Sequence, residues 1–167
     1  NAAHLTQRSE IVNQFLTTND GELNFNKISF IAGDIELPFF GMSKIDYELV
    51  SNSLTNFFHC AADLDFLMPP AQATTKVILA IDNIFTLISQ SPQRNIKLEY
   101  VSTVGVGGKC RSPLQEKHIT VGSDFFNSYE LAKFVGEQIL YKKMSDGFGI
   151  SILRPSMIVG HSQSGVV

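Results

Sequence analysis

Two kinds of apolar pattern alternate along this sequence. Short, mostly apolar runs typical of strands are separated by longer segments whose apolar residues fall on one helical face. The expected strands are residues 28–32, 56–62, 96–102 and 149–153. The expected helices are residues 8–18, 43–54, 70–90 and 124–145. Because helix-length connections between apolar strands indicate right-handed βαβ units, we expect an α/β fold: a parallel sheet with helices on both faces.

Capping and turn residues set the ends of these segments. Ser43 and Asp46 have the spacing of a capping box at the start of the second helix. Pro69-Pro70 prevents the third helix from starting earlier. We expect Asp124 to begin the last helix and Gly147 to follow its end.

The composition narrows the class of protein. The chain has 167 residues, enough for one domain with a real core, and its net charge is −3. No cluster of Lys or Arg stands out, which argues against nucleic acid or an anionic membrane surface as a partner. No apolar run reaches the length of a membrane span. Cys60 and Cys110 lack metal-type or redox-type spacing, so we expect reduced thiols, Cys60 in the core, in a cytoplasmic protein.

Candidate chemistry begins with Tyr129 and Lys133. Residues four apart on a helix share one face, with about 5–6 Å between their Cβ atoms, so both polar groups can enter one cleft. A neighbouring ammonium favours a phenolate, so Lys133 is expected to lower the pKa of Tyr129 toward the range useful for acid–base catalysis. The alternative is a half-buried tyrosine beside a solvated lysine.

Polar and small residues gather where the expected strands end. In parallel sheets, ligands bind outside the carboxyl ends of the strands. The residues expected there are Gly33-Asp34, Ala61-Ala62, Ser102-Thr103 and Arg154-Pro155. Thr103 precedes Tyr129 by 26 residues, at the end of the neighbouring strand. A hydroxyl, a phenol and an ammonium that converge there can polarise a carbonyl and deliver a proton to it.

Five segments in this order resemble a known family. They are Ala32-Gly33-Asp34-Ile35 with Pro38, Phe40-Gly41-Met42-Ser43 and Tyr47; Phe58-His59-Cys60-Ala61-Ala62 with Phe66 and Pro69; Tyr100-Val101-Ser102-Thr103; Tyr129 to Lys133 with Glu137; and Arg154-Pro155-Ser156-Met157-Ile158-Val159-Gly160 with Ser164-Gly165. With them, the chain resembles an extended short-chain dehydrogenase/reductase. It is most similar to the thioester-reductase and fatty acyl reductase (male-sterility-type) branch.

This resemblance implies a catalytic set. Tyr129 would give its proton to the substrate oxygen as hydride reaches the carbonyl carbon. Lys133 would lower the pKa of the tyrosine and hold the nicotinamide ribose, and Thr103 would hydrogen-bond the same substrate oxygen. The cofactor would be NADP or NAD.

The resemblance also implies further cofactor contacts. Asp34, with Ile35, would bind the adenine end, and Ala61 and Ala62 would pass beneath the cofactor because they lack bulk. Pro155-Ser156 would line the nicotinamide side. For Asp34 the alternative is a carboxylate that only caps a turn.

Other polar residues have simpler interpretations. His59, on an apolar strand, is expected to be a core histidine with its hydrogen bonds satisfied, and Arg154 can be structural. The remaining histidines have no partners at metal-ligand spacing, so no metal site is proposed.

Two departures from the family pattern bear on the domain organisation. The Asn-Val-x-Gly-Thr motif falls at residues 76–80, where Val77 alone matches. The glycine-rich dinucleotide fingerprint and the substrate domain expected after Gly160 are not found. Residues 1–167 therefore resemble a partial NAD(P)-binding Rossmann-like domain without its first βαβ unit. We expect this piece alone to be inactive.

Three functions agree with the residues. The first is an NAD(P)H-dependent reductase that converts acyl thioesters, on coenzyme A or a carrier protein, to aldehyde or alcohol. Lys109, Arg111 and Lys117, in the expected loop at residues 105–122, could meet phosphates of such a carrier. The second is a nucleotide-sugar epimerase or dehydratase of the same superfamily. The third is a non-catalytic dinucleotide-binding or interaction domain, for which the Thr103, Tyr129 and Lys133 set has no use. The oligomeric state is left open.

Overall fold

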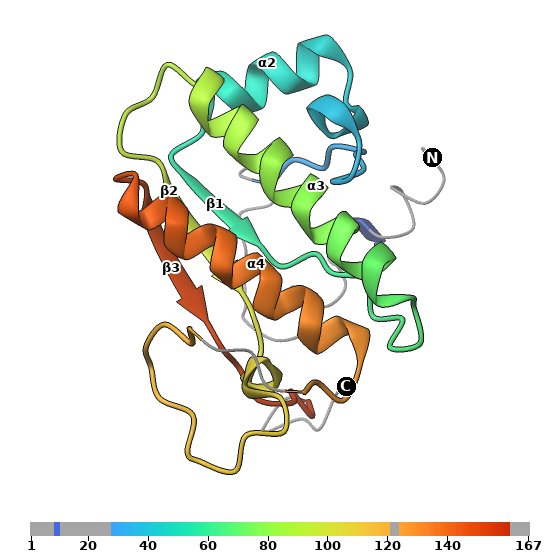
Figure 1. Cartoon of the computed structure of the whole chain (residues 1–167). Helices are drawn as coiled ribbons and strands as arrows, with labels where there is room; N and C mark the ends of the chain where they lie inside the picture. Colours follow the sequence, from blue (N-terminus) through green and yellow to red (C-terminus); the bar gives the residue numbers. More distant parts are fainter. Residues whose placement is uncertain (1–8, 11–27, 121–123, 161–167) are drawn as a thin grey trace.

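The computed structural model describes residues 9–10, 28–120 and 124–160, so the expected helix at residues 8–18 lies almost wholly outside it. Figure 1 shows helices packed against a small sheet. In chain order, the elements are η2 (Pro38–Gly41), α2 (Lys44–Ser53), β1 (Asn56–His59), α3 (Pro70–Gln90), β2 (Lys97–Val101), η3 (Val104–Gly107), α4 (Ser128–Ser145) and β3 (Gly149–Leu153). Among the described residues, no helix has both the length and the apolar character needed to cross a membrane.

The three strands are parallel and lie in the order β1-β2-β3, which confirms the parallel α/β prediction. The register aligns Phe57 with Leu98 and Ile150. Two residues further along each strand, His59 aligns with Tyr100 and Ile152 on the same face. His59 and Tyr100 therefore lie side by side near the carboxyl ends of β1 and β2.

Helices α3 and α4 lie side by side against one face of the sheet (Figure 1). They bury Leu98 and Tyr100 together with Ile81, Ile84 and Leu140. The opposite face, which carries Phe58, is exposed in the described part of the chain. Helices on both faces were expected. Two right-handed crossovers that step in the same direction put both helices on one face, and the second face is reached only where the strand order reverses.

Residues 28–32 were expected to form a strand, and this prediction is wrong. The segment is assigned to no strand and pairs with none in the described part of the chain. An apolar run becomes a strand only where a neighbour offers backbone partners. Similarly, the strand expected at 56–62 ends at His59, and side-chain alternation then turns Cys60 outward, so Cys60 is exposed rather than in the core.

Helix α4 begins later than expected, at Ser128 instead of Asp124. Asn127 is its N-cap, with the side-chain oxygen accepting a hydrogen bond from Glu130 N at 2.9 Å. Glu130 Oε2 accepts from Phe126 N at 2.9 Å, in the manner of a capping box. This reciprocal pair is unavailable to Asp124 and fixes the position of Tyr129 two residues into the helix. The predicted cap at Ser43, which accepts from Asp46 N at 3.1 Å, is confirmed.

The turn before α2 has an unusual backbone. Phe39, Phe40 and Gly41 have consecutive φ values of 54°, 55° and 58°, in the left-handed region that side chains disfavour. The turn is closed by a 2.7 Å hydrogen bond from Asp34 N to the carbonyl of Phe40. A Cβ at Gly33 would lie 3.0 Å from that same oxygen, so a side chain there would force this turn to shift slightly. This turn fixes the segment that carries Asp34 and Ile35.

Candidate active site

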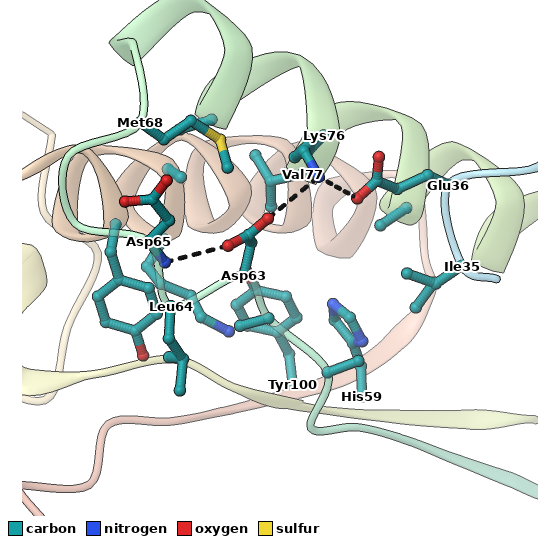
Figure 2. A pocket seen from close by; sticks show the side chains of 17 residues that line it. Ile35, Glu36, His59, Asp63, Leu64, Asp65, Met68, Lys76, Val77 and Tyr100 are labelled. Atoms are coloured by element: carbon teal, nitrogen blue, oxygen red, sulfur yellow. Dashed lines mark hydrogen bonds and ion pairs between the residues drawn. The ribbon is translucent and has the colours of Figure 1, made fainter. Parts of the chain in front are cut away.

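A pocket of about 500 Å³ lies at the carboxyl end of β1, between that strand and helices α3 and α4. Figure 2 shows the side chains that line it. They come from the turn at residues 35–36, from β1 and the loop after it, and from both helices. Tyr129 and Lys133 both line this pocket, as their helical spacing predicted.

Lys133 is buried, with only 4% of its surface exposed, so the solvated-lysine alternative is wrong. Its ammonium donates a 2.6 Å hydrogen bond to the carbonyl of Val101, at the end of β2. The same Nζ lies 4.8 Å from the ring centroid of Tyr100. Burial lowers the pKa of Lys133 to about 8, while Cys60 and Glu137 act in the opposite direction. The group therefore remains largely protonated at neutral pH.

The pKa of the Tyr129 phenol shifts in the direction opposite to the prediction. Burial raises its pKa, whereas Lys133 was expected to lower it. The reason is geometric: the Lys133 ammonium lies 5.9 Å from the centre of the Tyr129 ring and donates to a backbone carbonyl. Phe66 packs edge-on against the tyrosine ring at 5.7 Å. Tyr129 is thus held as a protonated phenol beside a cation, the state required of a proton donor.

Thr103 does not line this pocket. Its hydroxyl oxygen accepts a 3.1 Å hydrogen bond from Gly105 N and caps the short helix η3. The preceding Ser102 is buried, and its Oγ has no hydrogen-bond partner among the described residues. The structure thus brings Tyr129 and Lys133 together but gives Thr103 a local capping role.

The predicted cofactor residues separate into two groups. Ile35, Ala61 and Ala62 line the pocket with Tyr129 and Lys133. Asp34 is exposed outside it, and its Oδ1 accepts from Glu36 N at 2.9 Å, which is the turn-capping role of the alternative interpretation. Pro155 and Ser156 also lie outside the lining; the Pro155 carbonyl accepts from Val104 N at 3.1 Å.

With this geometry in hand, the comparisons with known proteins are informative. A family model for NAD-binding domains, described as male sterility protein, matches residues 2–167. The chain belongs to the male sterility protein family. The superfamily resemblance found in the motifs is confirmed by this match, as is a domain that binds NAD-type cofactors.

Relatives and solved structures agree with the family. The chain is similar to the non-canonical nonribosomal peptide synthetase FrzA of Cladobotryum sp: 28% identical over 150 residues, which are 84% of this chain and 14% of that protein. The aldehyde reductase lnbA of Aspergillus flavus is 26% identical over 152 residues, 84% of this chain and 15% of that protein. The crystal structure of the terminal R domain from the myxalamid PKS-NRPS biosynthetic pathway is 29% identical with a TM-score of 0.68, over 79% of this chain and 34% of that one.

In this member of the male sterility protein family, His59 is buried as expected but is not fully satisfied. Its Nδ1 has no hydrogen-bond partner within the described residues. Burial, and secondarily Lys133, lower the pKa of His59 to about 4, so the ring is neutral. A neutral imidazole beside the buried Lys133 adds no second cation to the site.

Arg154 has the structural role considered for it. It forms two hydrogen bonds with the fully buried carboxylate of Glu137, Nε to Oε1 at 2.9 Å and Nη2 to Oε2 at 2.6 Å. Its remaining N–H groups donate to the carbonyls of Gln115 and Lys117, each at 3.1 Å. The guanidinium of Arg154 therefore joins the end of β3 to α4 and to the loop that contains Gln115 and Lys117.

Sequence reasoning missed the charged residues of the pocket lining. Lys76, Glu36, Asp63 and Asp65 all line the pocket, and none was assigned a role there. The only signal in the sequence was that Lys76 stands where the family pattern has asparagine. Charge alone could not show that two carboxylates from separate segments meet this lysine.

Proposed function

We propose that the protein containing this domain is an NAD(P)H-dependent reductase of acyl thioesters attached to coenzyme A or to a carrier protein. The proposal rests on the protonated phenol of Tyr129 and the buried ammonium of Lys133 at one end of a single pocket. The names of the similar proteins, a peptide synthetase and an aldehyde reductase, support thioester reduction over nucleotide-sugar chemistry.

The lining of the pocket fits a dinucleotide. Ala61 and Ala62 place small side chains along the wall that follows β1, so a flat ring can approach the backbone closely. Ile35 adds an apolar contact on the opposite side. NADPH or NADH, when bound, would supply the hydride.

The chain's own residues would hold the substrate and move one proton. Tyr129 would donate its phenolic proton to the carbonyl oxygen of the thioester as hydride reaches the carbon. Loss of the thiol would then give the aldehyde, and a second reduction would give the alcohol. Lys133, whose Nζ has three N–H donors and uses one on Val101, can hold ribose hydroxyls with the others. Its charge would stabilise the phenolate that Tyr129 leaves behind.

The predicted site residues that do not line the pocket still have free hydrogen-bonding atoms for the roles proposed for them. The Thr103 oxygen accepts from Gly105, so its O–H can still donate to the substrate oxygen. Asp34 uses Oδ1 in its turn, and its second oxygen can accept from the adenine amino group. Pro155 and Ser156 follow β3 and would lie on the nicotinamide side.

The test uses the full-length protein that contains these residues. NADPH is supplied with either an acyl thioester or a UDP-sugar, and absorbance at the cofactor wavelength and the products are followed. We expect NADPH consumption and an aldehyde or alcohol product with the thioester. Turnover of the UDP-sugar alone would refute thioester reduction and leave only the family assignment.

A further inference from the structure

Lys76 of α3 lines the same pocket as Lys133 and extends between the carboxylates of Glu36 and Asp63 (Figure 2). Its Nζ lies 2.9 Å from Glu36 Oε1 and 3.0 Å from Asp63 Oδ2. Glu36 follows Asp34 and Ile35 in the turn before α2, and Asp63 follows Ala61 and Ala62. One ammonium therefore connects the two segments to which the proposed function assigns adenine-side and backbone contacts with the cofactor.

The two carboxylates are connected to their segments in different ways. Asp63 Oδ1 accepts from Asp65 N at 3.0 Å, so the same side chain that binds Lys76 also closes a local turn. The backbone N–H of Glu36 donates to Asp34 Oδ1 at 2.9 Å, whereas the Glu36 carboxylate accepts from Lys76. A displacement of the Asp63 carboxylate is thus transmitted directly to the backbone that lines the pocket, and Glu36 is coupled to its turn through its own side chain.

The face of α3 that presents Lys76 also holds the turn at a second point. Asn83, seven residues later and therefore on the same side of the helix, donates to the carbonyls of Ile35 at 2.8 Å and Leu37 at 3.0 Å. Asn83 fixes the turn to the helix, and Lys76 adds the link from the turn to the Asp63 segment. The two contacts can be separated by mutation.

The energetics favour a positioning role over a stabilising one. The side chains of Lys76, Glu36 and Asp63 are 28%, 35% and 40% exposed, and ion pairs at such exposure contribute little to folding. Removal of the cation has a larger local consequence, because Glu36 and Asp63 would then face each other as like charges. This repulsion, although screened by solvent, would favour a wider separation between the Asp34–Glu36 turn and the Ala61–Asp63 segment.

We propose that Lys76 is a positioning residue that sets the separation between the Asp34–Glu36 turn and the Ala61–Asp63 segment, and thereby the affinity for the dinucleotide. Lys76 acts on the cofactor through Glu36 and Asp63 and does not contact it. This inference rests on the proposed function. It concerns how the cofactor site is held in shape, not which substrate is reduced.

The experiment measures the Kd for NADPH by titration calorimetry with the full-length protein. The variants are Lys76→Met, Lys76→Arg, Glu36→Gln and Asp63→Asn, with Lys44→Met as the control because Lys44 pairs with Glu48 on the exposed side of α2. We expect Lys76→Met to weaken binding about tenfold through lost pre-organisation, and each carboxylate variant to weaken it by a smaller factor of about three. Lys76→Arg and Lys44→Met should bind as the wild type does.

The carboxylate variants discriminate between positioning and direct contact. If Lys76 bound a cofactor phosphate directly, Glu36→Gln and Asp63→Asn would free the ammonium and tighten NADPH binding, which would overturn the proposal. The combined variant Lys76→Met/Glu36→Gln/Asp63→Asn should bind better than Lys76→Met alone, because the repulsion is removed. Wild-type affinity in Lys76→Met would also overturn it.

A second readout separates positioning from general loss of structure. The kcat of Lys76→Met at saturating NADPH should stay close to the wild-type value while the KM for NADPH rises. A fall in kcat with an unchanged KM for NADPH would refute the positioning role. A folded wild-type protein that binds no NADPH would refute the proposed function itself, whereas binding that is insensitive to Lys76→Met would refute this inference alone.

Discussion

Lys133 of α4 and Lys76 of α3 line one pocket, and their pKa values shift in opposite directions. Burial dominates at Lys133 and lowers its pKa to about 8. At Lys76 the hydrogen bonds to Glu36 and then to Asp63 dominate, and its pKa is raised. The ammonium of Lys133 is thus near its titration point, whereas that of Lys76 stays charged. Burial without a carboxylate partner suits catalysis, whereas paired carboxylates suit the role of a fixed link.

Helix α4, which carries Lys133, also carries the buried carboxylate of Glu137. The largest effect is expected when Glu137 loses its partner Arg154. Arg154→Met would leave the carboxylate of Glu137 buried without its cation. Breaking a buried pair in this way costs about 3–5 kcal/mol. Hydrogen exchange measured by mass spectrometry should therefore show strongly reduced protection in α4 and around Gln115 and Lys117, whose carbonyls Arg154 binds.

The control is the double variant Arg154→Met/Glu137→Met, which removes the buried charge together with its partner. It should recover much of the protection, because an apolar pair of similar volume is often neutral. Unchanged exchange in Arg154→Met would show that the pair contributes nothing to holding the loop on the helix.

Tyr129→Phe tests whether the phenol of Tyr129 is the proton donor in the proposed reaction. Loss of a positioned proton donor should lower kcat about a hundredfold or more, with little change in NADPH binding. Steady-state kinetics on the full-length protein make the measurement. Phenylalanine keeps the ring contact with Phe66, so packing should be preserved. Near-wild-type turnover would remove Tyr129 from the mechanism.

The two lysines should also differ in their response to pH. Lys133 has a pKa near 8, so its ammonium loses its proton as the pH rises above that value. If the charge is needed, kcat/KM should fall about tenfold per pH unit above pH 8. In Lys76→Met, whose parent residue has a raised pKa, the same fall should persist from a uniformly lower starting value. A Lys133→Met variant that retains the fall would assign it to another group.

Local chemistry predicted the elements well. Pro70 as the first residue of α3, the Ser43 cap and the strand Gly149–Leu153 all appear where sequence placed them. The shared face of Tyr129 and Lys133 also followed from spacing alone. Each of these depends on residues within about one helical turn or one strand.

Features that depend on distant partners were not predictable in the same way. The choice of Asn127 over Asp124 as helix cap is an exception, because Glu130 is only three residues from Asn127 and the spacing of this capping box was overlooked in the sequence. The raised pKa of Tyr129 depends on burial, which spacing does not reveal. Lys76 meets carboxylates 40 and 13 residues away in the chain, so only the tertiary structure brings the three together.

The smallest expected effect comes from the exposed pair of Lys44 and Glu48, which lie 3.7 Å apart on α2. Lys44 is the first residue of the helix, where the dipole disfavours a cation, and lysine N-terminal to glutamate is the weaker order for such a pair. Lys44→Met should therefore change the free energy of unfolding by less than about 0.5 kcal/mol. Hydrogen exchange in α2 should be unchanged, in contrast to α4 in Arg154→Met. A loss of protection comparable to that in Arg154→Met would show that exposure does not distinguish the Lys44–Glu48 pair from the buried Arg154–Glu137 pair.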